Sequence, residues 1–274
     1  MIRSDRWNAV YAEVEQELKS RLPELMKGAS HRWGAMRWPA EAIPPAGVRP
    51  ENVAYISEDN GEIRHLFVVM TGRTIGPSRV GAAYPFVPHG VPYEVEIKAL
   101  HPAETGIEGE VTAQYGGHDF RFFEPLWGVK KNHYKVGALQ RIRFAAFGHS
   151  LAAMGGAEPK PDAPAIADGA APQAAAALPV PATAASALLE PASALVMIGP
   201  GPSSRYGVHA PILEWRGFWT GERLYYALKL RLFEGGGAFA VDLYAGRHCF
   251  AGAFSPAAGV AVAGVMWLHG TLVD

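Results

Sequence analysis

Stretches in which apolar and polar residues alternate dominate this chain of 274 residues. A period of two places one face of a β-strand in a core and leaves the other face in water. Because each stretch keeps a polar face, we expect antiparallel sheets with one solvated side, not a parallel sheet covered on both sides. The alternating stretches are residues 53–57, 63–69, 93–100, 107–115, 118–123, 139–147, 212–219, 224–232, 239–244 and 260–272.

Glycine-containing turns separate several of these stretches. Asn60-Gly61 stands between residues 53–57 and 63–69, and Gly116-Gly117 stands between residues 107–115 and 118–123. Both dipeptides favour the tight turns of two-residue hairpins, because glycine adopts positive φ without steric cost. The sequence therefore predicts consecutive antiparallel hairpins.

An Ala/Pro-rich segment, residues 155–193, divides the strand-rich parts and contains no aromatic residue. Such a composition cannot build a core, so we predict a linker. On either side, short strands follow one another with almost no helix, which is typical of small closed barrels. The predicted fold is mainly β, with two small antiparallel β-barrel (OB-like) domains at residues 51–154 and 194–274. Residues 1–50 are predicted to pack on the first domain.

The N-terminal region shows a helical period. Its apolar residues recur at steps of three and four, which predicts an amphipathic helix that starts after Ser4 and is kinked or restarted at Pro23. We expect the apolar face to dock on the first domain. Residues 31–50 have no period and are predicted to be an extended Trp/Pro segment. The helical stripe is Trp7, Val10, Tyr11, Val14, Leu18, Leu22 and Leu25.

The overall charge argues against strong binding to polyanions. The formal net charge is −1 and the sequence pI is about 6.8, so no whole-chain field attracts nucleic acid or an anionic membrane. Cys249 is the one cysteine and cannot form an intramolecular disulfide. We expect a cytoplasmic protein without a membrane partner, in which Cys249 is a buried apolar group.

A short string looks like the nucleophile elbow of the α/β-hydrolases. In Gly148-His149-Ser150-Leu151-Ala152, small residues stand two places on either side of a serine. The resemblance implies Ser150 as nucleophile, Asp242 as the orienting acid and His269 as the base, with His248 as the other candidate base. This gives a serine hydrolase as one alternative function.

The surroundings of this string favour a different interpretation. A nucleophile elbow opens a helix, whereas Gly155 and Pro159 stop a helix after about one turn. Arg141 and Arg143 make the preceding strand amphipathic, although an elbow follows a strand that is buried on both faces. The hydrolase therefore ranks behind a binding function.

Residues 120–135 interleave basic and aromatic side chains, as single-stranded nucleic-acid binding proteins do. Cations contact phosphates and rings stack on bases, which gives a single-stranded nucleic-acid binding protein as a second alternative. The competing interpretation is a solvated loop whose aromatic residues anchor the core. The candidate binding residues are Trp127, Lys130, Lys131, His133, Tyr134 and Lys135.

Metal and cofactor sites are not expected. The 10 histidines are scattered, without a His-Glu-x-x-His motif or paired cysteines. The acidic pairs Glu94/Glu96 and Glu108/Glu110 are predicted to lie on solvent faces of strands. We therefore predict a non-catalytic binding or assembly protein that recognises a macromolecule, most simply another protein, through its β-barrel surfaces.

Overall fold

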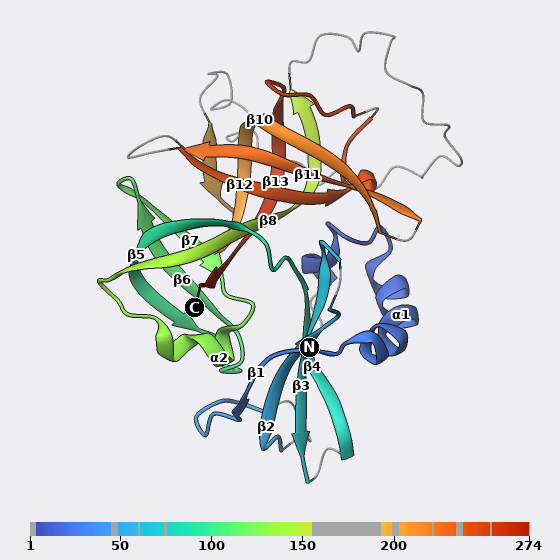
Figure 1. Cartoon of the computed structure of the whole chain (residues 1–274), viewed down its shortest axis with the longest axis vertical. Coiled ribbons are helices and arrows are strands. Elements are labelled where there is room, and N and C mark those ends of the chain that lie inside the picture. Colours follow the sequence, from blue (N-terminus) through green and yellow to red (C-terminus); the bar gives the residue numbers. More distant parts are fainter. Residues whose placement is uncertain are drawn as a thin grey trace.

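The computed structural model describes residues 4–44, 49–59, 61–73, 76–154, 193–198, 203–220, 222–233, 238–252 and 254–273 (Figure 1). The protein is mainly β, with 59% strand and 12% helix. The predicted linker lies outside the described residues except for Ser193. The strands form two sheets, one with four strands and one with nine.

The small sheet is antiparallel and has the order β1-β2-β3-β4. The β2–β3 hairpin confirms the expectation from the first two alternating stretches; Gly61 has a φ of 101°, while Asn60 is outside the described residues. Strand β1 was not expected, because a register shift between Arg32 and Gly34 breaks its period. The bounds are β1 (His31–Arg37), β2 (Asn52–Ser57), β3 (Arg64–Gly72) and β4 (Gly76–Phe86).

The large sheet is mixed and contains the remaining alternating stretches as strands. The turn between β6 and β7 confirms the predicted tight hairpin, since Gly116 and Gly117 both have positive φ. The bounds are β5 (Val91–Pro102), β6 (Gly109–Tyr115), β7 (His118–Phe123), β8 (Leu139–Met154), β9 (Ala194–Met197), β10 (Arg205–Thr220), β11 (Arg223–Phe233), β12 (Phe239–Gly246) and β13 (Ala261–Leu272).

Strand pairing in the large sheet forms two closed circuits. One runs β8–β5–β6–β7–β13 and the other β13–β10–β11–β12–β8, and in both circuits β8 also pairs with β13. The β8–β13 pairing extends from Ile142 opposite Leu272 to Met154 opposite Ala261. Strands from both sides of the predicted linker thus share one sheet. The domain boundaries stay a prediction, although the break between the two sheets falls between β4 and β5.

The two circuits repeat the same connectivity. Exchanging β5, β6, β7 and β8 for β10, β11, β12 and β13 converts every pairing of one circuit into a pairing of the other, including its orientation. One row of paired residues crosses the four central strands β7, β13, β8 and β12. In that order its residues are Phe123, His269, Ala145 and Asp242, and we call it the central row. The large sheet therefore has a pseudo-two-fold axis between Ala145 and His269.

Two tyrosines occupy equivalent places in this scheme. The Tyr206 hydroxyl on β10 accepts the Arg121 N–H at 2.6 Å and donates to the Arg121 carbonyl at 2.8 Å. The Tyr93 hydroxyl on β5 does the same with Ala240 on β12, at 2.9 Å in both directions. Each tyrosine thus binds the backbone N–H and carbonyl groups of a strand in the other half of the sheet. The bonded residues, Arg121 and Ala240, each precede by two positions the residue of their strand in the central row, Phe123 or Asp242.

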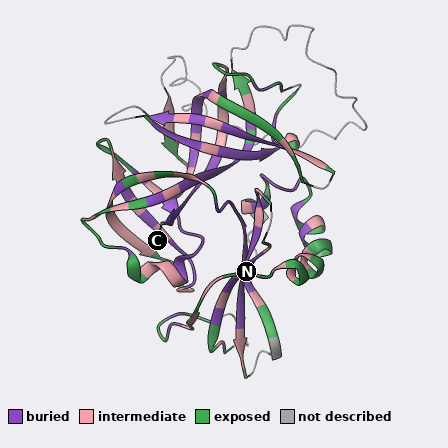
Figure 2. Cartoon of the chain, in the orientation of Figure 1, coloured by how far each residue is buried: buried purple, intermediate pink, exposed green. Residues whose placement is uncertain are grey.

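Apolar side chains form two cores, one made mostly by residues of the large sheet and one by residues of both sheets and the N-terminal region. Phe144, Leu243 and Leu268 lie in the first, whereas their neighbours Ala145 and Tyr244 lie in the second. Both faces are therefore buried in the middle of the central strands, as at residues 144–149 of β8 and in most of β12 (Figure 2). Strands β5 and β6 keep the predicted alternation, in which buried residues alternate with intermediate or exposed ones.

Residues 6–11, here called the strap, join the two sheets (Figure 1). Toward the small sheet, the Trp7 indole N–H donates to the Ala83 carbonyl at 3.3 Å, and the Tyr11 hydroxyl meets His65 Nε2 at 2.5 Å. Toward the large sheet, three carbonyls of the strap accept hydrogen bonds. The donors are His248 Nε2 to Asn8 at 2.9 Å, Gly246 N–H to Ala9 at 2.8 Å and the Tyr225 hydroxyl to Val10 at 2.9 Å.

These hydrogen bonds change the expected helix. Only Ser4–Trp7 forms a 3₁₀ turn, and helix α1 spans Val14–Gly28 with Pro23 inside it. The predicted start after Ser4 is wrong, because the strap carbonyls accept hydrogen bonds from β11, β12 and the 3₁₀ turn Arg247–Cys249 instead of from a following turn of helix. Burial of the stripe from Trp7 to Leu18 nevertheless follows the predicted face.

Candidate functional site

The string around Ser150 lies inside strand β8, not at a strand-to-helix turn. Ser150 is the one described non-glycine residue with positive φ, at 54°. It sits at a β-bulge, where Ser150 and Leu151 face Gly264 alone across the β8–β13 pairing. A Cβ on Gly264 would lie 2.6 Å from the Ser150 carbonyl oxygen, so the bulge requires a glycine there.

The structure does not bring the three hydrolase candidates together. Asp242 and His269 stand opposite Ala145 from its two sides, about 10 Å apart across two strand spacings. Ser150 lies five residues further along β8, which corresponds to about 16 Å. His269 is also enclosed by rings, with Trp267 at 3.9 Å and Phe147 at 4.9 Å between centroids. No nucleophile, base and acid converge here.

Two rings of the basic-aromatic segment are buried. Trp127 begins helix α2 (Trp127–Lys130) and fills the space above Gly109, where a Cβ would lie 2.2 Å from the indole. The Tyr134 hydroxyl donates to buried Glu124 at 2.5 Å. Neither ring is available for stacking on a base. The polar part is nearer to solvent, with Lys130 and Lys131 half-buried and His133 and Lys135 exposed.

Glu124 holds this segment to the end of the chain. Beside Tyr134 it accepts hydrogen bonds from the Leu126 N–H at 2.9 Å, the Thr271 hydroxyl at 2.9 Å and the Leu272 N–H at 3.2 Å. Burial raises the pKa of Glu124 against the effect of these hydrogen bonds. Since all of its partners belong to the fold, Glu124 has a structural role.

Glu108 corrects one expectation about the acidic pairs. It is buried, not on a solvent face, and binds the Arg6 guanidinium at 3.1 Å and the Tyr84 hydroxyl. The same guanidinium stacks over Phe123, with its carbon 4.3 Å from the ring centroid. The strap therefore brings a cation to a carboxylate that the sequence placed in water.

The other buried titratable groups also serve the fold. His65 is buried between the Tyr11 hydroxyl and the Glu58 carboxylate, which lies 2.7 Å from His65 Nδ1. Burial opposes ionisation of Glu58, but the hydrogen bonds from His65 outweigh it and lower the pKa of Glu58. Cys249 is buried as expected, and burial raises the pKa of its thiol to about 12. Within the described residues, no three potential metal ligands gather at one place.

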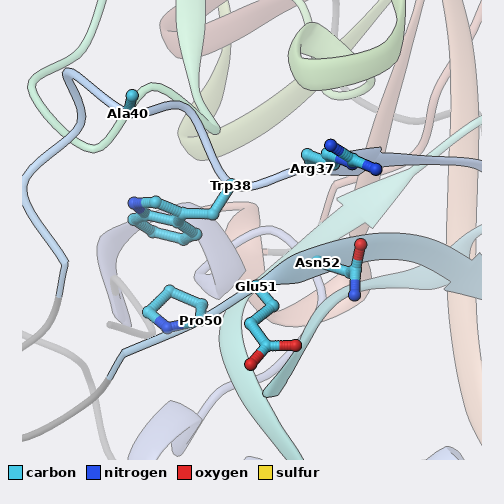
Figure 3. Close-up of a pocket in the computed structure, with 6 residues that line it drawn as sticks. All are labelled: Arg37, Trp38, Ala40, Pro50, Glu51 and Asn52. Atoms are coloured by element: carbon cyan, nitrogen blue, oxygen red, sulfur yellow. The ribbon is translucent and has the colours of Figure 1, made fainter. Parts of the chain in front are cut away.

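A pocket of about 530 Å³ lies at the edge of the small sheet (Figure 3). Figure 3 shows the Trp38 ring beside Pro50, with Glu51 and Asn52 projecting from the start of β2. The Glu51 carboxylate pairs with exposed Arg73 at 3.8 Å. The described residues that line the pocket include one carboxylate, Glu51, one cation, Arg37, and no nucleophile.

The strongest candidate for a functional surface is a ribbon formed by the end of β10 and the start of β11. Trp215 and Trp219 on β10 are 47% and 62% exposed, which is unusual for tryptophan. Both lie on one face with Gly217 between them, because strand residues two apart share a face. Leu224 and Tyr226 on β11 pair with Trp219 and Gly217 and complete what we call the tryptophan face.

The opposite face of the ribbon is fixed to the rest of the molecule. Phe218 stacks on Tyr225 with ring centroids 5.7 Å apart, and the Tyr225 hydroxyl bonds to the strap. Arg216 pairs with Glu62 in the loop between β2 and β3. Along β10 the residues pass from buried to exposed (Figure 2). The ribbon thus presents its two indoles from a rigid support.

Sequence reasoning missed this surface although it carried a signal. Alternation placed residues 212–219 in a strand but could not tell which face the core would cover. The signal was the repeat of tryptophan on both sides of a strand glycine, Trp215-Arg216-Gly217-Phe218-Trp219. In a strand, this pattern places both tryptophans on the face opposite Arg216, where they must be either buried in a core or exposed for a partner.

Comparison with known proteins gives no guide to the role of this surface: no protein family, no curated protein and no solved structure matches the chain. Helix α1 has 15 residues, and none of the helices in the described ranges is both long and apolar enough to cross a bilayer.

Proposed function

We propose that this chain is a non-catalytic binding and assembly protein that recognises a protein partner through the tryptophan face. The observation that carries the proposal is the exposure of Trp215 and Trp219 on a ribbon whose other face is anchored. Exposed aromatic side chains that are already held in place lose little entropy on binding. Tryptophan is also among the residues that contribute most to protein interfaces.

The chemistry of the face favours a protein over the other macromolecules. Its five residues include no charged side chain, whereas nucleic-acid binding depends on cations that neutralise phosphates. A carbohydrate would need acceptors as well as donors for its hydroxyl groups, and beside the two indole N–H donors the face offers only the buried hydroxyl of Tyr226. An apolar protein surface needs neither.

We further propose that each circuit of five strands is a small OB-like barrel and that residues 155–193 act as a linker. The support for the barrels is the closed order of strand pairing. The architecture of a fold transfers no function, so the role of the protein rests on the tryptophan face alone.

The proposal is tested by photo-crosslinking in the cells that make the protein. With p-benzoylphenylalanine in place of Trp219, we expect a crosslinked protein adduct whose yield falls at least tenfold when Trp215→Ala is added, because truncating an interface anchor costs about 2 kcal/mol or more. The control carries the probe at Leu139, which is 71% exposed at the start of β8. Equal adducts from both positions, or none from position 219, would overturn the proposal.

A further inference from the structure

The side chain of Arg6 ends inside a cage of three aromatic rings. The central carbon of its guanidinium lies 4.3 Å from the ring centroid of Phe123, 4.7 Å from that of Trp267 and 5.1 Å from that of Tyr84. The Glu108 carboxylate closes the cage, 3.1 Å from a guanidinium nitrogen. Aromatic cages bind organic cations because the faces of their rings are electronegative.

The cage is built by the two sheets and not by the strap. Tyr84 comes from β4, Phe123 from β7 and Trp267 from β13. The Tyr84 hydroxyl donates to Glu108, and the Trp267 indole N–H donates to the Ser204 hydroxyl at 3.0 Å. The rings of Tyr84 and Phe123 also meet edge to face, with centroids 5.1 Å apart. Because none of these contacts involves Arg6, the cage is preorganised for a cation.

Charge determines what the cage accepts. Glu108 is buried, and among the described residues Arg6 is the cation that pairs with it. A carboxylate that is left buried without a cation is strongly disfavoured, so the cage requires a positive group. A planar guanidinium stacks on rings and donates to a carboxylate at the same time, whereas the ammonium group of lysine is a compact, strongly hydrated charge. The matching ligand is therefore an arginine side chain.

The rest of the strap is bound as an extended peptide ligand would be. Its carbonyls at Asn8, Ala9 and Val10 accept hydrogen bonds from the large sheet and from the turn after β12. Trp7 and Tyr11 form hydrogen bonds with the small sheet through their side chains. Peptide-recognition sites have the same organisation, in which backbone hydrogen bonds give affinity and side-chain pockets give specificity. In the described part of the chain the strap belongs to no strand, so its release breaks no strand pairing.

We propose that Tyr84, Phe123, Trp267 and Glu108 form an arginine-binding site and that Arg6 is its tethered ligand, which an arginine of a partner polypeptide replaces when the strap is released. The ligand class is an arginine side chain on an extended peptide. A tethered ligand competes at an effective concentration of roughly millimolar, so the strap excludes weak arginine ligands. The site shares no residue with the tryptophan face, and neither proposal depends on the other.

Cys249 reports the release of the strap in the full chain. Its thiol is buried beneath the strap, with Sγ 3.3 Å from the Asn8 carbonyl oxygen, and it is the one cysteine of the sequence. An aromatic disulfide reagent attacks this thiol once the strap has moved away, since burial suppresses the reactive thiolate. We expect Arg6→Ala to react at least about tenfold faster than the wild type in native buffer, because it leaves Glu108 without its cation.

The control for lowered stability is Tyr206→Phe, a change that does not touch the strap. It should react about as fast as the wild type. Equal rates for Arg6→Ala and the wild type would contradict the tethered ligand, and so would a Tyr206→Phe rate as high as that of Arg6→Ala, because the thiol would then be exposed by global unfolding.

Exchange of the ligand is tested by adding a labelled peptide of residues 4–11 to the full chain carrying Arg6→Ala. We expect saturable binding in fluorescence anisotropy, and binding at least about tenfold weaker when citrulline replaces the arginine of the peptide, because citrulline has the same shape without the charge. The wild type should bind the arginine peptide at least about tenfold more weakly than Arg6→Ala, because its own strap competes.

Near-UV circular dichroism shows whether Arg6→Ala is folded. If it is not, Arg6→Lys is the host for the same titration, since it keeps a charge beside Glu108. Equal affinity for the arginine and citrulline peptides, or no binding of the arginine peptide to the folded variant, would overturn the inference. Crosslinking at position 219 is unaffected by either result.

Discussion

His269 is a histidine in surroundings that accept only its neutral form. It is almost fully buried among Trp267, Phe147 and Phe123, and neither ring nitrogen has a hydrogen-bond partner among the described residues. Burial, and after it the nearby Arg6 guanidinium, lowers the pKa of His269 well below its usual value. Protonation of this ring therefore favours the unfolded chain.

The sign of the pH dependence follows. The unfolded chain binds a proton at His269 below about pH 6.5 and the folded chain does not, so stability is lost as pH falls through that value. Between pH 7.5 and 5.5, we expect the wild type to lose about 1.4 kcal/mol more unfolding free energy than His269→Leu. Urea unfolding at the two pH values measures this difference. The exposed-site control His133→Leu should behave as the wild type, and equal pH dependence in His269→Leu would contradict the prediction.

Prediction of single residues from the sequence succeeded where local pattern decided burial. Cys249 was expected to be buried and lies in the core. The burial of Glu108 was not predicted, because its partner Arg6 is more than a hundred positions away in the sequence. A local pattern cannot indicate an ion pair between residues so far apart. The exposed tryptophans were missed for the related reason that alternation does not identify which face meets solvent.

At the scale of elements, the two bridging tyrosines give a matched experiment. Tyr206 is buried and Tyr93 only half-buried, although both make the same pair of hydrogen bonds to a strand backbone. Burial also raises the pKa of Tyr206 to about 12, so its hydroxyl remains a donor at neutral pH.

We expect Tyr206→Phe to lower the unfolding free energy by about 2 kcal/mol and Tyr93→Phe by about 1 kcal/mol. The difference arises because water can replace the lost hydroxyl at the half-buried site and not at the buried one. Chemical denaturation of both variants and of the double variant measures it. A larger loss at Tyr93 would show that burial does not control the contribution of these bridges.

Elements were predictable where their period was regular. The alternating stretches correspond to β2, β3, β5 to β8 and β10 to β13, and Gly116-Gly117 correctly marked a hairpin. Strand β1 was hidden by its bulge. The helix start was wrong because the strap carbonyls accept hydrogen bonds from residues far away in the sequence, such as Tyr225 and His248. A helical period cannot reveal such a tertiary effect.

For the whole molecule, the shared sheet makes a direct prediction about the segment outside the described residues. Strands β12 and β13 pair with β8, so the cores on either side of residues 155–193 are continuous. A site-specific protease sequence inserted within residues 155–193 and cleaved should leave two fragments that co-elute in native buffer. They should separate only under denaturing conditions. Fragments that part in native buffer would support independent domains; an uncut chain carried through the same steps is the control.

Long-range pairing marks the limit of prediction at this scale. The alternation correctly indicated a mainly β protein, but the pairing of β8 with β13 joins residues more than a hundred positions apart, and two-residue periodicity carries no record of which strands meet. The repeated connectivity became visible once the pairing register was known.

The exchange of strands around the Ala145–His269 centre has a consequence for ancestry and engineering. Each half of the large sheet completes its circuit with a strand that belongs to the other half. A polypeptide containing only one half would leave two edges open, and a second identical polypeptide would close them both. The connectivity is that of two intertwined protomers fused end to end, so the present chain descends most simply from a gene whose product worked in pairs.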